Sequence, residues 1–392
     1  MPELDTHRVG RGSVAAAHHR RLRIAHLTTI DMSLALLLAR ELECDLEAGH
    51  EVIGISAPGP YVAQIEKLGV RHVPVPSLTR SWSPRADLLA ARQLWRLLRT
   101  LGLDVLHTHQ PKSGVLGRIL GRAAGIPVVV NTCHGLWACP DDRLLKKAFV
   151  YGAETIAAWC SHAELYQNDD DRRTLRRVVP QDRVRTVGNG IDLRRFTRDL
   201  EGRARVRREL GVGGDTLLVG GVGRRVAEKG LIEFIAAAES LSDQATFVWI
   251  GPEDSDKPKR FIQETRAVRF LSERRDMPAV YSALDIFVLP SHREGFSRSA
   301  MEAAACRTAL VLSDIRGCRE IGAHEQELLL VPPRDSGALA AAIKRLIRDT
   351  ELRDRLAKRA AQHARIEFDQ LTVAAVSLET YRSVACRKGL TW

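Results

Sequence analysis

The sequence predicts an α/β fold of two domains, each built on a parallel sheet. The chain has 392 residues, which is too long for one ordinary core and favours two domains of about 150–200 residues. From residue 21 onward, predicted strands and helices alternate, as they do in βαβ units. The alternation is interrupted at VRTVGNGIDLRRF (184–196), which contains Gly188, Asn189 and Gly190.

Short apolar segments predict the strands, and the longer segments between them predict the helices. The predicted strands are 21–28, 51–57, 72–76, 104–109, 126–132 and 162–168, followed after the interruption by 216–222, 245–251, 268–272, 286–290, 308–313 and 327–332. The predicted helices follow the first strand to about Ala48, then cover 86–101, 113–123, 142–159 and 228–241, with three closing helices over 335–388. Residues 1–20 lack the apolar core of a signal peptide and predict a flexible basic tail.

Composition and charge restrict the class of partner. No stretch approaches the roughly 18–20 apolar residues of a membrane span, and seven scattered cysteines without C-x-x-C favour free thiols in a reducing cytosol. The net charge of +11 suits phosphorylated ligands or anionic lipid headgroups, whereas no nucleic-acid-binding module is recognisable. We therefore expect a cytoplasmic protein whose Arg-rich segments form solvated faces or a peripheral contact at the inner membrane face.

Two glutamates in the segment 291–321 form the most specific pattern. Glu294 follows predicted strand 286–290, and Glu302 lies in the next predicted helix, with seven residues between the two. Ligands of parallel α/β sheets bind outside the carboxyl ends of the strands, and the free N–H groups of residues 295–299 can hold phosphate or sugar oxygens. This layout suits a ligand with hydroxyls at both ends and phosphate in the middle, such as a nucleotide sugar.

The Gly-rich loop VGGVGRRVAEKG (219–230) presents two cations, Arg224 and Lys229. It does not fit a dinucleotide fingerprint, because Val226 stands where the third glycine is required. Fixed cations stabilise the negative charge that develops on a leaving diphosphate, and they can replace a divalent metal. The acidic runs Asp141–Asp142 and Asp169–Asp171 could mimic a D-x-D metal motif, but we interpret them as N-caps of the helices that follow.

These motifs together resemble a known family. The elements P-S-x-x-E-G-F, E-A-A-A-C and S-D-I-R-G-C-R-E-I are similar to the donor site of retaining glycosyltransferases of family 4, which have the GT-B fold of two facing Rossmann-like domains around a cleft. The resemblance covers about residues 21–385 and includes the N-G-I-D segment that joins the domains. It implies an acceptor domain over 21–192, a nucleotide-sugar donor domain over 193–370, and a C-terminal helix (371–392) that packs back on the first domain.

The resemblance also assigns roles to residues of the donor site. Glu294 is expected to face the transferred sugar and Glu302 the ribose hydroxyls, with Arg224 and Lys229 against the pyrophosphate. His134, in the H-G that follows predicted strand 126–132, is expected near the anomeric carbon. Further donor contacts are expected from Gly295, Phe296, Ser297, Ser299 and Arg274.

The first domain is expected to supply the acceptor side, through Thr29, Asp31, His109 and Lys112. Its first loop has no glycine where the family usually has Gly-Gly, so the acceptor contacts should differ. His107 and His109 project to the same side of a strand, but the sequence offers no third convergent ligand, and we interpret them as cleft-lining residues rather than a zinc site. Cys306-Arg307-Thr308-Ala309 stands where the family often has C-G-x-P, which suggests a different helix C-cap.

The sequence thus predicts a retaining glycosyltransferase that moves a sugar from a nucleotide sugar, with a UDP-sugar preferred, to an acceptor hydroxyl. No metal, other cofactor or nucleic-acid partner is expected, and the acceptor is either a lipid-linked glycan or a small metabolite. Two alternatives stay open: a UDP-sugar 2-epimerase of the same fold, and a catalytically silent nucleotide-binding partner protein. The intact donor residues argue against the second of these.

Overall fold

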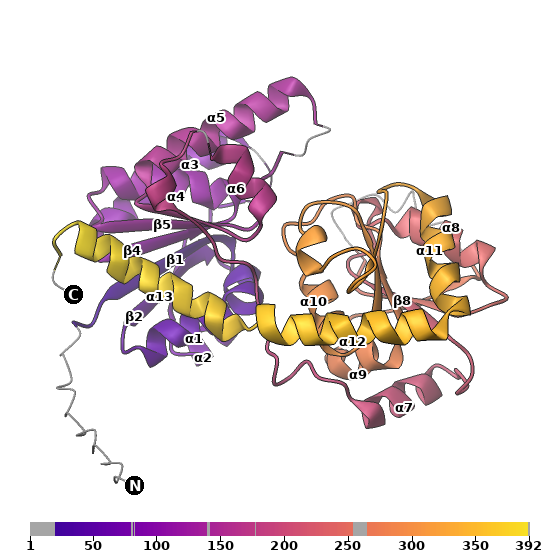
Figure 1. Ribbon diagram of the computed structural model, residues 1–392. Coiled ribbons are helices and arrows are strands. Elements are labelled where there is room, and N and C mark those ends of the chain that lie inside the picture. Colours follow the sequence, from indigo (N-terminus) through magenta and orange to yellow (C-terminus); the bar gives the residue numbers. More distant parts are fainter. Residues whose placement is uncertain are drawn as a thin grey trace, which may run out of the picture.

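The computed structural model describes residues 20–79, 81, 83–138, 142–176, 178–253 and 265–390. These residues form two α/β domains, each around its own parallel sheet, which confirms the predicted fold class (Figure 1). The predicted basic tail lies outside the described residues apart from Arg20, and so does Asp141.

The first sheet has seven strands in the order β3-β2-β1-β4-β5-β6-β7. Their bounds are Arg23–Ile30 (β1), Glu51–Ala57 (β2), Arg71–Pro74 (β3), Val105–His109 (β4), Val128–Cys133 (β5), Ala163–Tyr166 (β6) and Val184–Thr186 (β7). The six predicted strands of this half are present. β7 was not predicted. It lies at the start of the segment 184–196, which was expected to interrupt the alternation of strands and helices, and it pairs with β6 as a short edge strand. Three residues with a single neighbouring strand leave little periodic signal in a sequence.

The second sheet has six strands in the order β10-β9-β8-β11-β12-β13, and all six were predicted. Their bounds are Leu218–Val222 (β8), Thr246–Ile250 (β9), Val268–Leu271 (β10), Ile286–Leu289 (β11), Ala309–Ser313 (β12) and Leu329–Val331 (β13). Successive side chains face opposite layers: Phe287 and Leu289 belong to one buried cluster, Ile286 and Val288 to the other. Helices cover both faces, which explains the continuous apolar runs of these strands.

Helices connect the strands of both sheets. In the first half they are α1 (Ala39–Glu47), α2 (Val62–Lys67), α3 (Pro84–Thr100), α4 (Pro111–Ala123), α5 (Leu144–Cys160) and α6 (Asp169–Leu175). In the second they are α7 (Leu200–Glu209), α8 (Leu231–Ser240), α9 (Met277–Ala283), α10 (Arg298–Ala305), α11 (Ser336–Arg348), α12 (Thr350–Glu367) and α13 (Gln370–Arg387). The single helix expected after the first strand is instead a π-helical turn, η1 (Ser33–Leu37), followed by α1.

The chain crosses between the domains twice at one place. Ile191 N–H donates to Phe368 O at 2.9 Å, and Gln370 N–H donates to Ile191 O at 3.2 Å. A Cβ on Gly190 would lie 2.4 Å from Gln370 Cα, so only glycine fits this crossing. Beyond it, α13 lies along the first domain (Figure 1), where Tyr381 packs in a buried cluster with residues of β1, β4 and β5.

Candidate active site

A cavity of about 460 Å³ lies between the two domains. The first domain lines it with Thr29, Gln110, Lys112 and His134, and the second with Glu294 among others. Thr29 lies near the end of β1, and the other four follow β4, β5 and β11. The carboxyl ends of parallel strands from both sheets therefore meet at this cavity, which is where ligands of such sheets bind.

The two domains touch backbone to backbone beside this cavity. A Cβ on Gly295 would lie 2.0 Å from His134 O, and a Cβ on Gly135 would lie 2.8 Å from Gly295 Cα. Asn168 Nδ2 donates to Gly295 O at 3.0 Å across the same junction. The glycines thus allow a close approach that any side chain would prevent, and the structure shows a closed cleft.

Lys229 and Glu294 form an ion pair at the edge of the cleft. Lys229 Nζ lies 2.6 Å from Glu294 Oε1, and the Glu294 side chain is 11% exposed. Gly230, with φ of 71°, turns the chain into α8 immediately after Lys229, and a Cβ there would lie 2.0 Å from Pro290 O. Arg224 is exposed in the loop after β8. Lys229 belongs to the Gly-rich loop, and Glu294 belongs to the segment that carries the two glutamates. The two residues are 65 positions apart in the sequence, and the fold brings them together as the order of the motifs implied.

The second glutamate lies in α10 and is oriented by a tyrosine. Tyr281 Oη donates to Glu302 Oε2 at 2.8 Å, and burial raises the pKa of this carboxyl above its ordinary value. Ser297 caps α10, with its Oγ accepting from Ala300 N–H, and Ser299 Oγ lies 3.2 Å from Ser297 Oγ. Phe296 packs edge-on against Phe368, so its ring serves the core rather than a ligand.

Two of the predicted contact residues are engaged elsewhere. Arg274 pairs with Asp276 at 2.9 Å and with Glu209, so its guanidinium closes a surface network between α7 and α9. Asp31 accepts from Tyr61 N–H at 2.7 Å and from Met32 N–H at 2.8 Å. Its carboxylate is buried and shapes the turn after β1.

The predicted acceptor-side residues differ in their access to the cleft. Thr29 Oγ1 lies 3.1 Å from Ser113 Oγ, and the Thr29 backbone N–H donates to Gln110 Oε1 at 3.0 Å. Lys112 lines the cavity, but its ammonium donates to Thr79 O at 3.0 Å and Ser81 O at 2.8 Å. His109 is fully buried beneath His134.

His134 stands between the cleft and a chain of buried imidazoles. Its Nε2 lies 3.0 Å from His109 Nδ1, and burial lowers its pKa to about 4, so the ring is neutral near pH 7. His107 and His109 have 0% exposure, which corrects the expectation that they line the cleft. The assumed lack of a third convergent group is also wrong, because His26 and Glu41 lie beside them. The sequence gives no sign of this, since His26 belongs to a different strand.

Two arginines of the second domain that had no predicted role bond across the cleft to the first domain. Arg316 of the second domain pairs at 2.5 Å with the buried Asp171 and also donates to Leu136 O. Arg298 donates to Leu36 O at 2.9 Å. Within the first domain, Gln110, at φ of 69°, donates through Nε2 to Ser33 Oγ at 2.5 Å and so joins the end of β4 to η1. Arg316 lies within the S-D-I-R-G motif, whereas the positive φ of Gln110 has no sequence signal.

The described residues of the acidic runs lie at the starts of helices, though not as N-caps. The N-cap of α6 is Asn168, whose side chain accepts from Asp171 N–H, while Asp169 to Asp171 form the first turn. Asp142 pairs with Lys146 at 2.7 Å, and Arg143 holds the N-cap position of α5. The capping interpretation was therefore wrong in position. The run in the first turn of α6 still matches the helix dipole, whereas Asp142 precedes the N-cap of α5.

Comparisons with known proteins cover both domains. The family model "Glycosyl transferases group 1" matches residues 202–363, and "Glycosyl transferase 4-like domain" matches residues 34–190. "UDP-Gal:alpha-D-GlcNAc-diphosphoundecaprenol alpha-1,3-galactosyltransferase" from Escherichia coli is 26% identical over 349 residues, 85% of this chain and 90% of that protein. "D-inositol 3-phosphate glycosyltransferase" from Salinispora tropica is 30% identical over 345 residues, 78% of this chain and 70% of that protein. The crystal structure of Anabaena Alr3699/HepE in complex with UDP has a TM-score of 0.79 at 20% identity, covering 92% of this chain and 100% of that chain.

Proposed function

The chain belongs to the group 1 glycosyltransferases, and on this premise we propose that it moves a sugar from a UDP-sugar to a hydroxyl of a lipid-linked acceptor, with retention at the anomeric carbon. Membership confirms the resemblance inferred from the motifs, and with it sugar transfer as the class of reaction. The finer proposal depends on the Lys229–Glu294 pair, whose carboxylate lines the same cavity as His134.

UDP is proposed as the carrier of the donor sugar. The name of the E. coli relative specifies UDP-Gal, and the Anabaena structure contains UDP. In this chain, Arg224 and Lys229 would neutralise the diphosphate, and Glu302 would accept two hydroxyls of the ribose. Two fixed cations and the N–H groups at the start of α10 take the place of a divalent cation at the diphosphate.

The ion pair also supports a transfer step without a covalent enzyme intermediate. Lys229 orients Glu294 at 2.6 Å, so the carboxylate offsets positive charge on the sugar rather than attacking it. The bond from the anomeric carbon to the diphosphate oxygen breaks, and the bond to the acceptor oxygen forms on the same face. The acceptor proton passes to the leaving phosphate oxygen, while the closed Gly135–Gly295 contact excludes water.

A lipid-linked acceptor is supported by an apolar stripe on α5. Four large side chains at helical i+4, i+7 and i+3 spacing are 58–88% exposed: Leu145, Phe149, Ile156 and Trp159. The helix lies on the outer edge of the first domain (Figure 1), and its start carries the exposed Arg143. Large exposed apolar patches flanked by cations are typical of surfaces that lie in the headgroup region of an anionic membrane.

A further cavity continues from α5 toward the cleft. It measures about 700 Å³ and is lined by Lys146 of α5 and by Arg293 and Arg316, which also line the cleft cavity. These cations, two of which already pair with Asp142 and Asp171, would hold the diphosphate of an acceptor whose lipid stays in the membrane under α5. Within the described part of the chain, no helix has the length and apolar character that a membrane-spanning segment requires, so this contact would be peripheral, at the inner membrane face.

Vesicle sedimentation tests the α5 surface. Burial of each large apolar side chain contributes about 1.5 kcal/mol or more, so Leu145→Ser with Phe149→Ser should weaken binding to phosphatidylglycerol vesicles by on the order of 100-fold. Ile366→Ser is the control, because Ile366 is 76% exposed but lies on α12 of the other domain. Equal binding by the double variant, or self-association through α5 without lipid, would reject the membrane contact.

Calorimetric titration with UDP, GDP and ADP, first without metal and then with EDTA, tests the donor site. We expect UDP binding that survives EDTA and is lost in Glu302→Ala and Arg224→Ala, whereas Arg274→Ala, which removes only a surface network, retains it. No nucleotide binding by folded protein would reject the donor site. The 2-epimerase and silent-partner alternatives are not favoured, since both relatives compared above are named for sugar transfer.

A further inference from the structure

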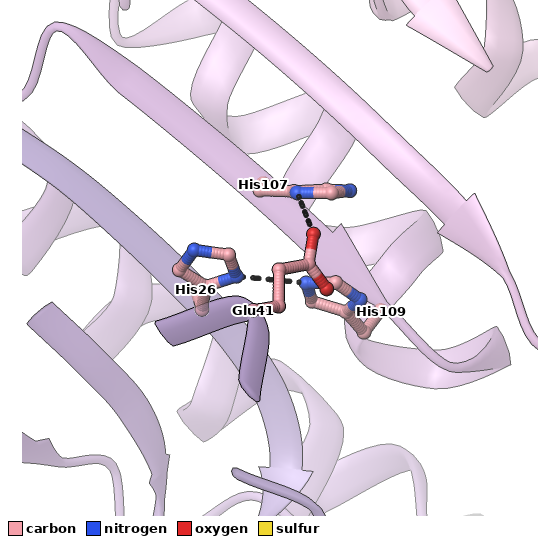
Figure 2. A group of neighbouring side chains, drawn as sticks. All are labelled: His26, Glu41, His107 and His109. Carbon is pink, nitrogen blue, oxygen red and sulfur yellow. Dashed lines mark hydrogen bonds and ion pairs between the residues drawn. The ribbon is translucent and has the colours of Figure 1, made fainter. Parts of the chain in front are cut away.

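Four side chains of the first domain converge in a buried cluster that the transfer step does not use. His26 comes from β1, Glu41 from α1, and His107 and His109 from β4 (Figure 2). The register of the two strands places His26 directly beside His107. One potential ligand atom of each side chain lies within 4.8 Å of the others. The three histidines have 0% exposure, and the Glu41 side chain is 15% exposed.

The distances within the cluster are close to those of a metal site. His26 Nδ1 lies 3.1 Å from His109 Nε2, and His107 Nδ1 lies 3.3 Å from Glu41 Oε1. Around a tetrahedral ion with bonds of about 2.0–2.1 Å, neighbouring ligand atoms are about 3.3 Å apart. Both pairs already have this spacing. To close the site, the two pairs must approach each other and the contact of Tyr381 Oη with His107 Nδ1 must be released.

The three histidines are also held from behind. The second ring nitrogens of His26, His107 and His109 all have a polar partner. These partners are, in that order, Asp45 Oδ2 at 2.7 Å, Thr132 Oγ1 at 2.8 Å and His134 Nε2 at 3.0 Å. The Glu41 carboxylate is positioned by Ser377 Oγ, which donates at 2.5 Å to Oε1, the oxygen that also faces His107. Metal-binding histidines and carboxylates characteristically have such outer partners, which fix the tautomer and the ring orientation.

The charges of the cluster favour a cation. Among the described residues, the ion pairs of Glu41 and Asp45 are formed with His107 and His26, and not with Lys or Arg. Burying two carboxylates is costly unless positive charge accompanies them. Three imidazoles and one carboxylate in a closed site are a ligand set suited to Zn²⁺, whereas Mg²⁺ and Ca²⁺ prefer oxygen ligands throughout.

We propose that His26, Glu41, His107 and His109 bind a structural divalent transition metal ion of the Zn²⁺ class. This departs from the sequence-based expectation of no metal, which assumed that no third ligand was available. The ion would join β1, β4 and α1. It would leave the proton of His109 on Nδ1, so that this N–H donates to His134 Nε2 and orients the cleft histidine from below.

The cluster is reachable from a cavity of about 360 Å³. Glu41, Thr132, His134 and Ser377 are among its lining residues, so an ion can enter past the Glu41 carboxylate. Tyr381 Oη lies 2.6 Å from His107 Nδ1. This phenol must give up its hydrogen bond with that nitrogen when the ion binds.

Metal analysis of the full chain tests the proposal. Protein purified without chelator is analysed by plasma mass spectrometry, then stripped and titrated with Co²⁺, whose visible absorption reports tetrahedral nitrogen and oxygen ligands. We expect about one zinc per chain, lost in His26→Gln and Glu41→Gln, and an affinity about 10–100-fold weaker in Asp45→Asn. His72→Gln should keep the zinc, because His72 lies on β3 of the same sheet and bonds Ser56 outside the cluster.

The outcomes separate this proposal from the proposed function. A folded wild-type chain without metal, without Co²⁺ bands and without a rise in melting temperature on adding Zn²⁺ would overturn the metal site, and the cluster would then be a hydrogen-bonded imidazole network. If that chain binds UDP, the donor site stands unaffected. A zinc-containing chain that binds no nucleotide would refute only the donor site.

Discussion

Gly295→Ala should separate the two domains at the point where their backbones touch. The new Cβ would lie 2.0 Å from His134 O and 2.8 Å from His134 C. An ordinary carbon–oxygen contact is about 3.3 Å, so the cleft must open by about 1.3 Å at this point. Misplacement of about 1 Å in an active site costs on the order of 100-fold in rate, which corresponds to about 2.7 kcal/mol of transition-state free energy.

Steady-state kinetics with UDP calorimetry measure this effect. We expect kcat/KM to fall about 100-fold while UDP affinity changes little, because the proposed UDP ligands all lie on the second domain. Gly214→Ala is the matched control, since a Cβ there meets nothing within 4 Å. A Gly295→Ala enzyme with wild-type kcat/KM would show that the closed contact is not the reactive arrangement.

Three further predictions follow from contacts of the described residues. Lys229→Met should lower kcat about 100–1000-fold, because it removes the counter-charge of Glu294 and of the diphosphate. Lys358→Met is the control, since it alters only an exposed ion pair on α12 and should leave kcat unchanged. If Lys229→Met and Lys358→Met have the same kcat, the role of Lys229 is refuted. Arg316→Ala should cost about 3 kcal/mol of unfolding free energy in urea titrations, because the buried Asp171 loses its cation, whereas Arg319→Ala at the half-exposed Asp170 pair should cost at most about 1 kcal/mol. Burial, with Lys388 and Arg122 nearby, lowers the pKa of His162 from 6.5 to about 4. Between these two pH values the unfolded chain binds a proton that the folded chain does not, so the free energy of unfolding falls as the pH drops from 6.5 to about 4. The His162→Asn variant should lose less stability over this pH range, and an equal loss would contradict the assignment to His162.

The twelve strands predicted from the sequence are all present, because most of them are local apolar runs buried under helices on both faces of a sheet, although the edge strands β3 and β10 are largely unburied. The short edge strand β7 and the π-helical turn at Ser33–Leu37 are not visible in this way. Edge pairing and a widened helical turn depend on neighbouring elements rather than on a local period. The contacts of Arg274 could not be predicted for the same reason. One of its carboxylate partners, Asp276, is close in the sequence, but the other, Glu209, belongs to a distant helix.

By itself, the sequence determined the α/β class, the place of Glu294 after β11, and the family to which the chain belongs. Those features are set by short-range patterns and by fixed motif spacing. The tertiary structure alone decided that His26 lies beside His107, that Arg316 reaches Asp171 over 145 residues of chain, and that Gly295 meets His134 across the cleft. A periodic pattern shows which face of a strand is buried, but strand order and the closure of two domains are long-range choices made by packing.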